Sequence, residues 1–366
     1  MRFSSLPFAS LLFSTVLASG AANAQGFGSV FTLDNDADDN RVSVALRLPG
    51  GGLFPFGAYS TGGEGTAGGL GSQGALAASQ NGRVLLAVSP GSNEVSMFRV
   101  LFGVFLWRTD TEASGGEMPT SVAMHKRLVY VLNAGSDSVT GFRRVGSNLV
   151  PIPGATYGLS QAGAAAAQVG FSPDGDYLVV TERATDTIGV FPVLPNGRLG
   201  AGNFQPSAGQ TPFGFAFRND GTLVVSEAAG GAAGASEVSS YRICGGGDLQ
   251  VVTGAADTNE SAACWIAIPR NGQFAYTTNT GDGTVTGFAL GGVGDLSLLD
   301  ADGVTGDLGG SAAPIDAAFS RNGRLLYVLD AGEDRIRAFY RHNDGSLTPL
   351  PVSLPLEDGA AGLLAR

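Results

Sequence analysis

The stretch WIAIPRNGQFAYTTNTGDGTVTGFAL, residues 265–290, contains three short runs in which apolar residues alternate with small or polar ones. Such alternation is typical of half-buried β-strands. Asn271-Gly272 separates the first two runs, and Asn-Gly is a strong signal for a tight β-hairpin. A small polar turn, Gly281-Asp282-Gly283, separates the second run from the third. The stretch is therefore predicted to form three consecutive antiparallel strands.

The same pattern recurs along the chain. It is found at 74–100, 120–145, 168–193, 213–243, 265–290 and 315–341. The residues at the first turn of each copy, Gly82, Lys126, Gly175, Gly221, Gly272 and Gly323, are 44 to 51 residues apart. β-rich repeats of about 40–50 residues are typical of a β-propeller, in which each repeat forms one four-stranded blade.

The two ends of the chain supply a seventh blade. Residues 30–48 match the second and third strands of a repeat that lacks its first strand, and 359–365, GAAGLLA, resemble the start of a first strand. We label the strands a to d from the axis outward. The sequence predicts an all-β, seven-bladed propeller with four strands per blade, whose first blade is completed by the C-terminal strand. This pairing removes the open edges that the ring would otherwise expose.

The repeats resemble a known family. LVYVLNAGSDSVTGF (128–142), FSPDGDYLVVTE (171–182), CWIAIPRNGQFAYTTNTG (264–281) and PIDAAFSRNGRLLYVLDAG (314–332) are similar to the lactonase-like propellers, the group that contains propeller-type 6-phosphogluconolactonase and fungal carboxymuconate-lactonising enzymes. The resemblance covers nearly all of 27–365 and implies a lactone hydrolase. Related YVTN-type propellers often serve as scaffolds or binding modules, so the resemblance leaves that alternative open.

The composition narrows the functional classes. The chain has 366 residues and a net charge of −11, with no basic block, which argues against binding of nucleic acid or an anionic membrane. It contains one Lys, two His and two Cys, too few for a His-rich metal site or a four-cysteine zinc site. We expect no cofactor and no metal. Cys244 and Cys264 are placed on opposite faces of the propeller, which favours free thiols over a disulfide.

The N-terminus has the pattern of a secretory signal peptide. Arg2 precedes an apolar run from Leu6 to Leu17, and Ala22-Asn23-Ala24 gives a small-x-small end. We expect residues 1–24 to be removed and 25–366 to form one propeller domain. The protein would then be secreted, or periplasmic in a bacterium, and not inserted in a membrane.

The residues that end strand b define a predicted site. In a propeller the b–c turns share one face with the starts of strand a, here called the b–c face. The a–b and c–d turns share the opposite face, the a–b face. A residue able to hydrogen bond ends strand b in all seven units: Asp34, Ser89, Asn133, Glu182, Glu227, Asn279 and Asp330. We expect these side chains to encircle one mouth of the central channel.

A lactone would be hydrolysed at this mouth by a carboxylate that activates water and by a cation that stabilises the oxyanion. The catalytic candidates are Glu182, Glu227 and Arg183. The ligand-binding candidates are Gln73, Asn133, Trp265, Asn279, Asp316 and Asp330. The acidic mouth favours a sugar or carboxylic-acid lactone over a phosphorylated one. The same polar residues would, in the alternative interpretation, cap strands and tie turns in a scaffold that binds a glycan, a peptide or a surface partner.

Two further patterns are weaker. The segment 34–40 carries alternating carboxylates that would suit calcium, but it lacks the glycine and the distant Glu of an EF-hand and is expected to be a solvated hairpin turn. His125 and His342 fall in turns of the a–b face, away from the predicted mouth, so neither serves a Ser-His-Asp triad there.

Overall fold

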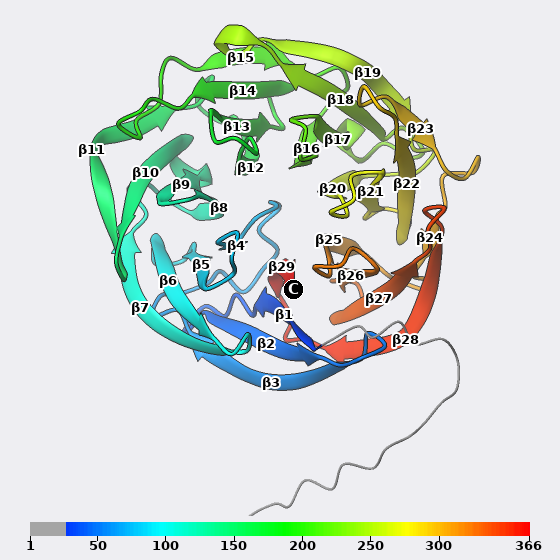
Figure 1. Cartoon of the computed structure of the whole chain (residues 1–366), viewed down its shortest axis with the longest axis horizontal. Coiled ribbons are helices and arrows are strands. Elements are labelled where there is room, and N and C mark those ends of the chain that lie inside the picture. Colours follow the sequence, from blue (N-terminus) through cyan, green and yellow to red (C-terminus); the bar gives the residue numbers. More distant parts are fainter. Residues whose placement is uncertain (1–26) are drawn as a thin grey trace, which may run out of the picture.

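The computed structural model describes residues 27–366, and the predicted signal peptide lies outside them. Seven antiparallel sheets stand around a central axis like the blades of a propeller (Figure 1). This confirms the predicted fold. Three short 3₁₀ turns, η1 (Ala134–Ser136), η2 (Ala229–Gly231) and η3 (Gly245–Gly247), are the helical segments in the described part of the chain. None of them is long or apolar enough to span a bilayer.

The blades follow one another in sequence order. Blade 1 consists of β29 (Ala361–Ala365), β1 (Gly28–Leu33), β2 (Arg41–Arg47) and β3 (Leu53–Ser60). Blade 2 consists of β4 (Leu76–Ala78), β5 (Val84–Ser89), β6 (Glu94–Leu101) and β7 (Phe105–Ala113). Blade 3 consists of β8 (Pro119–His125), β9 (Leu128–Asn133), β10 (Ser138–Val145) and β11 (Asn148–Gly158). Blade 4 consists of β12 (Ala166–Phe171), β13 (Tyr177–Glu182), β14 (Thr187–Pro192) and β15 (Asn203–Pro206).

The other three blades have the same order. Blade 5 consists of β16 (Pro212–Phe217), β17 (Leu223–Glu227), β18 (Glu237–Ile243) and β19 (Leu249–Asp257). Blade 6 consists of β20 (Ala263–Ala267), β21 (Phe274–Asn279) and β22 (Thr284–Leu290), with its outer edge divided between β23 (Leu296–Leu298) and β24 (Gly306–Asp307). Blade 7 consists of β25 (Pro314–Phe319), β26 (Leu325–Asp330), β27 (Arg335–Arg341) and β28 (Leu347–Pro355).

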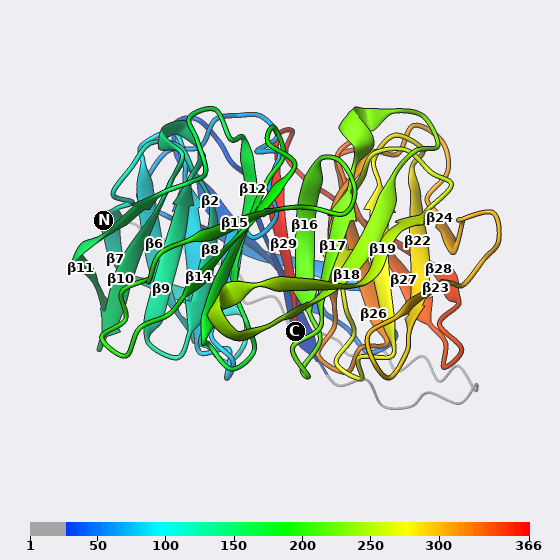
Figure 2. The ribbon, with the colours of Figure 1, turned by 90° about the horizontal axis from the view of Figure 1, so that it is seen from above.

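The ring is closed by the C-terminal strand, as the sequence predicts. β29 pairs with β1 in antiparallel register, with Val30 opposite Ala365 and Thr32 opposite Leu363. Figure 2 shows β29 running along the axis from one face to the other. The inner strand of blade 1 is therefore the last strand of the chain, and blades 1 and 7 become neighbours.

Neighbouring blades contact each other mainly through strands a and b. Strand b is almost fully buried in every blade because it has a blade neighbour on each side. Three buried tyrosines on strand b, Tyr130, Tyr276 and Tyr327, each donate a hydrogen bond to a backbone carbonyl in the c–d turn of the next blade, at 3.0, 2.6 and 2.8 Å. These tyrosines fill the apolar space between blades while their hydroxyl groups remain paired.

Candidate functional site

The inner strands of neighbouring blades are joined by side chains at one repeated position. Ser121 Oγ accepts a hydrogen bond from Val169 N in the next blade. Gln168 makes two bonds to Phe215, accepting from its N–H at 2.6 Å and donating to its carbonyl at 3.0 Å. Asp316 Oδ2 accepts from Leu363 N at 2.8 Å across the closure of the ring. Polar residues at this position hold the channel wall together.

Blade 5 lacks such a side chain, because the equivalent residue is Gly214. A Cβ atom there would lie 2.5 Å from the Cys264 carbonyl oxygen, so this close approach of two strands requires glycine. Gln73, from the segment that precedes β4, occupies the space instead. Its amide accepts from Ile266 N at 3.1 Å and donates to Ile266 O at 2.8 Å. Gln73 therefore makes the two bonds that Gln168 makes one blade earlier.

Gln73 belongs to a segment, residues 71–74, that crosses the b–c end of the channel; we call it the strap. Gln73 N donates to Ala167 O of blade 4, and Ser121 Oγ of blade 3 donates to Gln73 O. Ser72 O accepts from the indole N–H of Trp265 in blade 6 at 3.0 Å. The strap thus ties blades 3, 4 and 6 together and occupies the centre of the predicted mouth.

Arg183 lies beside the strap. Its Nε donates to Ala165 O at 2.9 Å, and its guanidinium carbon is 5.1 Å from the centre of the Phe213 ring. A Cβ atom on Gly71 would be 3.3 Å from Arg183 Nη1, which shows how closely the guanidinium approaches the strap. Burial lowers the pKa of Arg183. Among residues 27–366, no carboxylate forms an ion pair with it.

Trp265 and Cys264 form an apolar floor next to Arg183. Both are buried, and they pack with Phe213 and Ala167 in one cluster. The Phe213 and Trp265 rings are 4.8 Å apart. Burial raises the pKa of the Cys264 thiol to about 12, so it is not a nucleophile at neutral pH. The cysteines are both free, with Cys244 exposed on the other face, as the predicted topology requires.

Asp316 is buried in the channel wall. It accepts from Ala317 N at 2.7 Å and from Leu363 N at 2.8 Å, and burial raises its pKa to about 8. The two backbone bonds oppose this rise, but burial has the larger effect. Asp316 therefore joins blades 7 and 1 through its hydrogen bond from Leu363 N.

The two glutamates have separate sets of hydrogen-bond partners. Glu182 accepts from Ser160 N at 3.0 Å, from Ser160 Oγ and from Thr185 Oγ1 at 3.0 Å. Ser160 lies in the loop that leads into β12 of the same blade. This carboxylate is fully buried and fixes that loop to the end of strand b.

Glu227 has the same arrangement one blade later. It accepts from Ser207 Oγ at 2.6 Å and Gly209 N at 2.9 Å, in the loop that leads into β16. Ser239 Oγ and the Tyr241 hydroxyl complete its partners, at 2.6 and 3.1 Å. Glu182 and Glu227 have no hydrogen-bond partner in common, and each fixes the inner loop of its own blade.

Three other ring residues also bond within their own blades. Asn133 Nδ2 donates to Thr140 Oγ1 at 3.2 Å, and Asn279 Nδ2 donates to Thr286 Oγ1 at 2.8 Å. Asp330 accepts from Ala313 N at 2.9 Å, in the loop before β25. All three side chains are fully buried. Strand b ends at these three residues, as predicted, and their side chains fasten turns and loops of the b–c face.

Comparison with known proteins agrees with this architecture. The sequence pattern of the family described as "Lactonase, 7-bladed beta-propeller" matches residues 145–232 and 227–362, more than half of the chain. The chain belongs to the seven-bladed propeller lactonase family. No curated protein matches it.

Solved structures similar to this lactonase-family propeller include two bacterial proteins. A protein from Bacteroides uniformis, described as a putative 6-phosphogluconolactonase, is 16% identical with a TM-score of 0.74, over 93% of this chain and 99% of the other. The periplasmic gluconolactonase of Pseudomonas aeruginosa is 19% identical with a TM-score of 0.74, over 92% and 98% of the two chains. At these identities the likeness shows a common fold.

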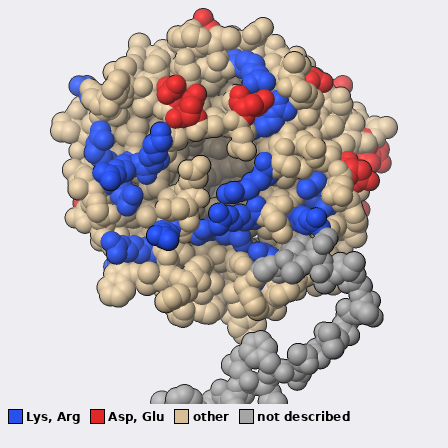
Figure 3. All heavy atoms as spheres, in the orientation of Figure 1, with Lys and Arg blue, Asp and Glu red and all other residues tan. Residues whose placement is uncertain are grey.

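The lactonase-family propeller carries opposite charges on its two faces. The b–c turns contain nine carboxylates and one cation, Arg183. The carboxylates are Asp34, Asp36, Asp38, Asp39, Asp137, Asp186, Asp282, Glu333 and Asp334. The a–b turns contain three carboxylates, Asp174, Asp176 and Asp220. Together with Arg366 they contain eight cations: Arg83, Lys126, Arg127, Arg218, Arg270, Arg321, Arg324 and Arg366. Figure 3 shows Lys and Arg around the central hollow of the a–b face.

Two features of the site lie outside the sequence-based expectations: the strap across the channel and the basic a–b face. Gly68, Gly69 and Gly71 are a sign of an irregular segment, but they do not show that it crosses the channel. The basic residues occur singly or in pairs, beside turn glycines such as Gly82 and Gly323. Placing these turns on one face would have revealed the basic surface.

Proposed function

We propose that this protein is an exported hydrolase that opens a sugar or carboxylic-acid lactone at the b–c end of its channel. Membership of the lactonase family supports the reaction class. The observation that carries the proposal is Arg183, a largely buried guanidinium without an ion-pair partner in residues 27–366, held against Phe213 beside the strap. A guanidinium that has no ion-pair partner can bind an anionic group of a ligand or stabilise an oxyanion.

Hydrolysis requires attack of water on the lactone carbonyl carbon. The carbonyl oxygen becomes negatively charged in the tetrahedral intermediate, and a guanidinium placed beside it stabilises that charge. Collapse of the intermediate breaks the ring C–O bond, and the ring oxygen leaves as a hydroxyl after it receives a proton. The product is a hydroxy acid, whose carboxylate Arg183 would also bind.

A carboxylate takes the proton from the attacking water in this proposal, and Glu182 or Glu227 has that role. Each already accepts hydrogen bonds from serine hydroxyls, Ser160 and Ser207 respectively. A water molecule would donate to the carboxylate in the same manner if it displaced the serine. Movement of the loop before β12 or β16 would therefore have to accompany catalysis.

The test compares turnover with stability. Rates on a panel of aldonolactones and simple carboxylic-acid lactones are measured by pH-stat for the wild type, Glu182→Gln, Glu227→Gln and Arg183→Ala. Loss of a general base costs about 10²–10⁴-fold in rate, and loss of an oxyanion donor about 10²–10³-fold. Arg335→Ala, which removes a partly exposed arginine that pairs with Glu333 on the same face, is the matched control.

The outcomes separate the roles of the glutamates. A large loss of turnover with a small change in melting temperature supports catalysis by that glutamate. A lower melting temperature with unchanged turnover means that the glutamate only anchors its loop. If Arg183→Ala retains wild-type turnover, the site is not at this end of the channel.

The second candidate function is a non-catalytic binding module. The observation in its favour is that the hydrogen-bonding capacity of Glu182 and Glu227 is taken up by their own blades. This reading takes the place of the first if no lactone on the panel is hydrolysed above the spontaneous rate. Export is tested separately, by N-terminal sequencing of protein recovered outside the cytoplasm, with Gln25 as the expected first residue.

A further inference from the structure

A cavity of about 620 Å³ opens on the a–b face between blades 2 and 3. This is the size of a site for a small molecule. Five of its lining residues are cations, Arg83, Arg99, Lys126, Arg127 and Arg144, and none is a carboxylate. The chain has a net charge of −11, so five positively charged side chains around one cavity are unusual and call for a physical explanation.

The cations of this cavity are not neutralised by the protein. Within residues 27–366, none of the five forms an ion pair. Arg99 donates to Ser147 Oγ at 2.9 Å and Arg144 donates to Gly146 O at 3.2 Å, both uncharged acceptors. Guanidinium donors are thus left available for a ligand.

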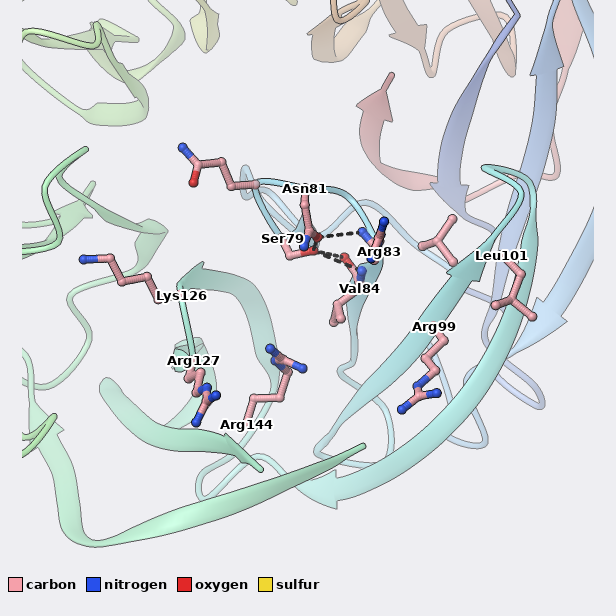
Figure 4. Close-up of a pocket in the computed structure, with 11 residues that line it drawn as sticks. Ser79, Asn81, Arg83, Val84, Arg99, Leu101, Lys126, Arg127 and Arg144 are labelled. Carbon is pink, nitrogen blue, oxygen red and sulfur yellow. Dashed lines mark hydrogen bonds between the residues drawn. The ribbon is translucent and has the colours of Figure 1, made fainter. Parts of the chain in front are cut away.

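One wall of the cavity is a rigid turn. Ser79 Oγ donates to Asn81 Oδ1 at 2.9 Å, which also accepts from Arg83 N at 3.0 Å, and Val84 N donates to Ser79 Oγ at 3.0 Å. Figure 4 shows this network in the blade 2 turn, with Arg144 and Arg127 of blade 3 on the opposite side. Cations on two blades therefore face one space from fixed backbones.

The positive charge continues toward the axis. A second cavity, of about 340 Å³, occupies the mouth of the channel on this face and shares Ser79 and Gln80 with the first. Arg270, Arg321 and Arg366 line it. Burial, and then the charges of Arg321 and Arg270, lower the pKa of Arg366. The two cavities form one basic surface, which attracts anions to the first cavity.

We propose that the cavity between blades 2 and 3 binds a sugar-sized ligand that carries two or more phosphate or sulfate esters. Each ester presents several oxygens at tetrahedral angles, and arginines bind such groups through paired N–H donors. A single anion would leave most of the five cations without a counter-charge, whereas two or more esters match them. This site is on the opposite face from Arg183, so it does not depend on the proposed lactonase activity.

The test uses two polyanionic probes, myo-inositol hexakisphosphate and sucrose octasulfate, with inorganic phosphate and sucrose as references. Binding to the full propeller is measured by isothermal titration calorimetry at low and at physiological salt. The variant Arg127→Gln/Arg144→Gln removes two cations from neighbouring positions of blade 3, where Arg144 N donates a hydrogen bond to Arg127 O. The variant Arg41→Gln/Arg335→Gln makes the same change in net charge on the b–c face and is the matched control.

We expect both probes, or one of them, to bind with 1:1 stoichiometry, and the affinity to fall as salt is added. Loss of two charge-assisted contacts should weaken binding by about a hundredfold, while the control variant binds as the wild type does. A preference for one probe identifies the ester. The proposal is overturned if neither probe binds, if inorganic phosphate binds as tightly as the probes, or if the control variant is weakened equally. Melting curves of both variants establish that they are folded.

Discussion

Replacement of Gln73 by alanine should destabilise the whole propeller, although Gln73 lies in no regular strand. The substitution removes both hydrogen bonds to Ile266 and leaves its N–H and carbonyl without partners next to a buried glycine. A hydrogen bond contributes about 0.5–1.5 kcal/mol net, and an unpaired buried polar group costs about 1–3 kcal/mol. We expect a loss of about 3 kcal/mol in the free energy of unfolding.

This loss can be converted to a melting temperature. Unfolding entropy is about 2.1 cal/mol/K per residue, or about 0.7 kcal/mol/K for roughly 340 residues. The melting temperature of Gln73→Ala should therefore fall by about 4 °C, measured by differential scanning calorimetry. Gln168→Ala is the matched control, because Gln168 makes the same two bonds to Phe215 from strand a of blade 4. Both variants should lose a similar amount.

A second substitution tests the geometry. A methyl group on Gly214 would lie 2.2 Å from Gln73 Oε1 as well as 2.5 Å from the Cys264 carbonyl oxygen. Gly214→Ala should thus be destabilising, and part of its cost should disappear when Gln73 is already alanine. The reasoning is refuted if the two substitutions are additive, or if Gln73→Ala melts like the wild type while Gln168→Ala does not.

Three other predictions follow from the structure. Deletion of residues 359–366 should lower the melting temperature sharply and produce oligomers on size exclusion, because β1 is left with an open edge; a monomer with unchanged melting would show that β29 does not close the ring. Ellman's reagent should react with one thiol, Cys244, in the folded protein and with two after denaturation, and two reactive thiols in the folded state would mean that Cys264 is not buried. The raised pKa of Asp316, about 8 against 3.8, means that the folded protein holds a proton that the unfolded chain releases, so the free energy of unfolding should fall as pH rises from about 4 to about 8. Asp316→Asn should flatten this dependence in melts from pH 5 to 9, and an equally steep profile in the variant would assign it to other groups.

The blades were predictable because each depends on local pattern. Alternating residues and turn glycines recur at 44–51-residue intervals, so the sequence places every strand b and even the missing strand of blade 1. The free cysteines followed from the same topology, since Cys244 and Cys264 fall on opposite faces.

The site depends on long-range contacts that no local pattern contains. Gln73 is 193 positions away in sequence from Ile266, to which its amide is hydrogen bonded. The amide replaces a side chain that strand a of blade 5 lacks, because the residue there is Gly214. The position of Glu182 at the end of strand b was predictable from its strand. Its partner Ser160 was not, because that residue lies in a loop without periodic pattern. The sequence therefore indicates which side chains reach the b–c face but not what they contact there.

The closure of the ring also affects how the protein folds. Thr32 Oγ1 reaches the Ala361 carbonyl, 329 positions away, and blade 1 lacks its inner strand until that last segment is available. Six blades are formed by segments that are continuous in sequence, but the ring can close only when residues 361–365 reach β1. Contacts of such sequence separation slow folding because the loop-closure entropy is lost before the contact forms. We therefore expect a late, slow folding step in which an open six-blade arc captures β1 and β29 together, and the edges of that arc would be the part of the molecule most exposed to aggregation.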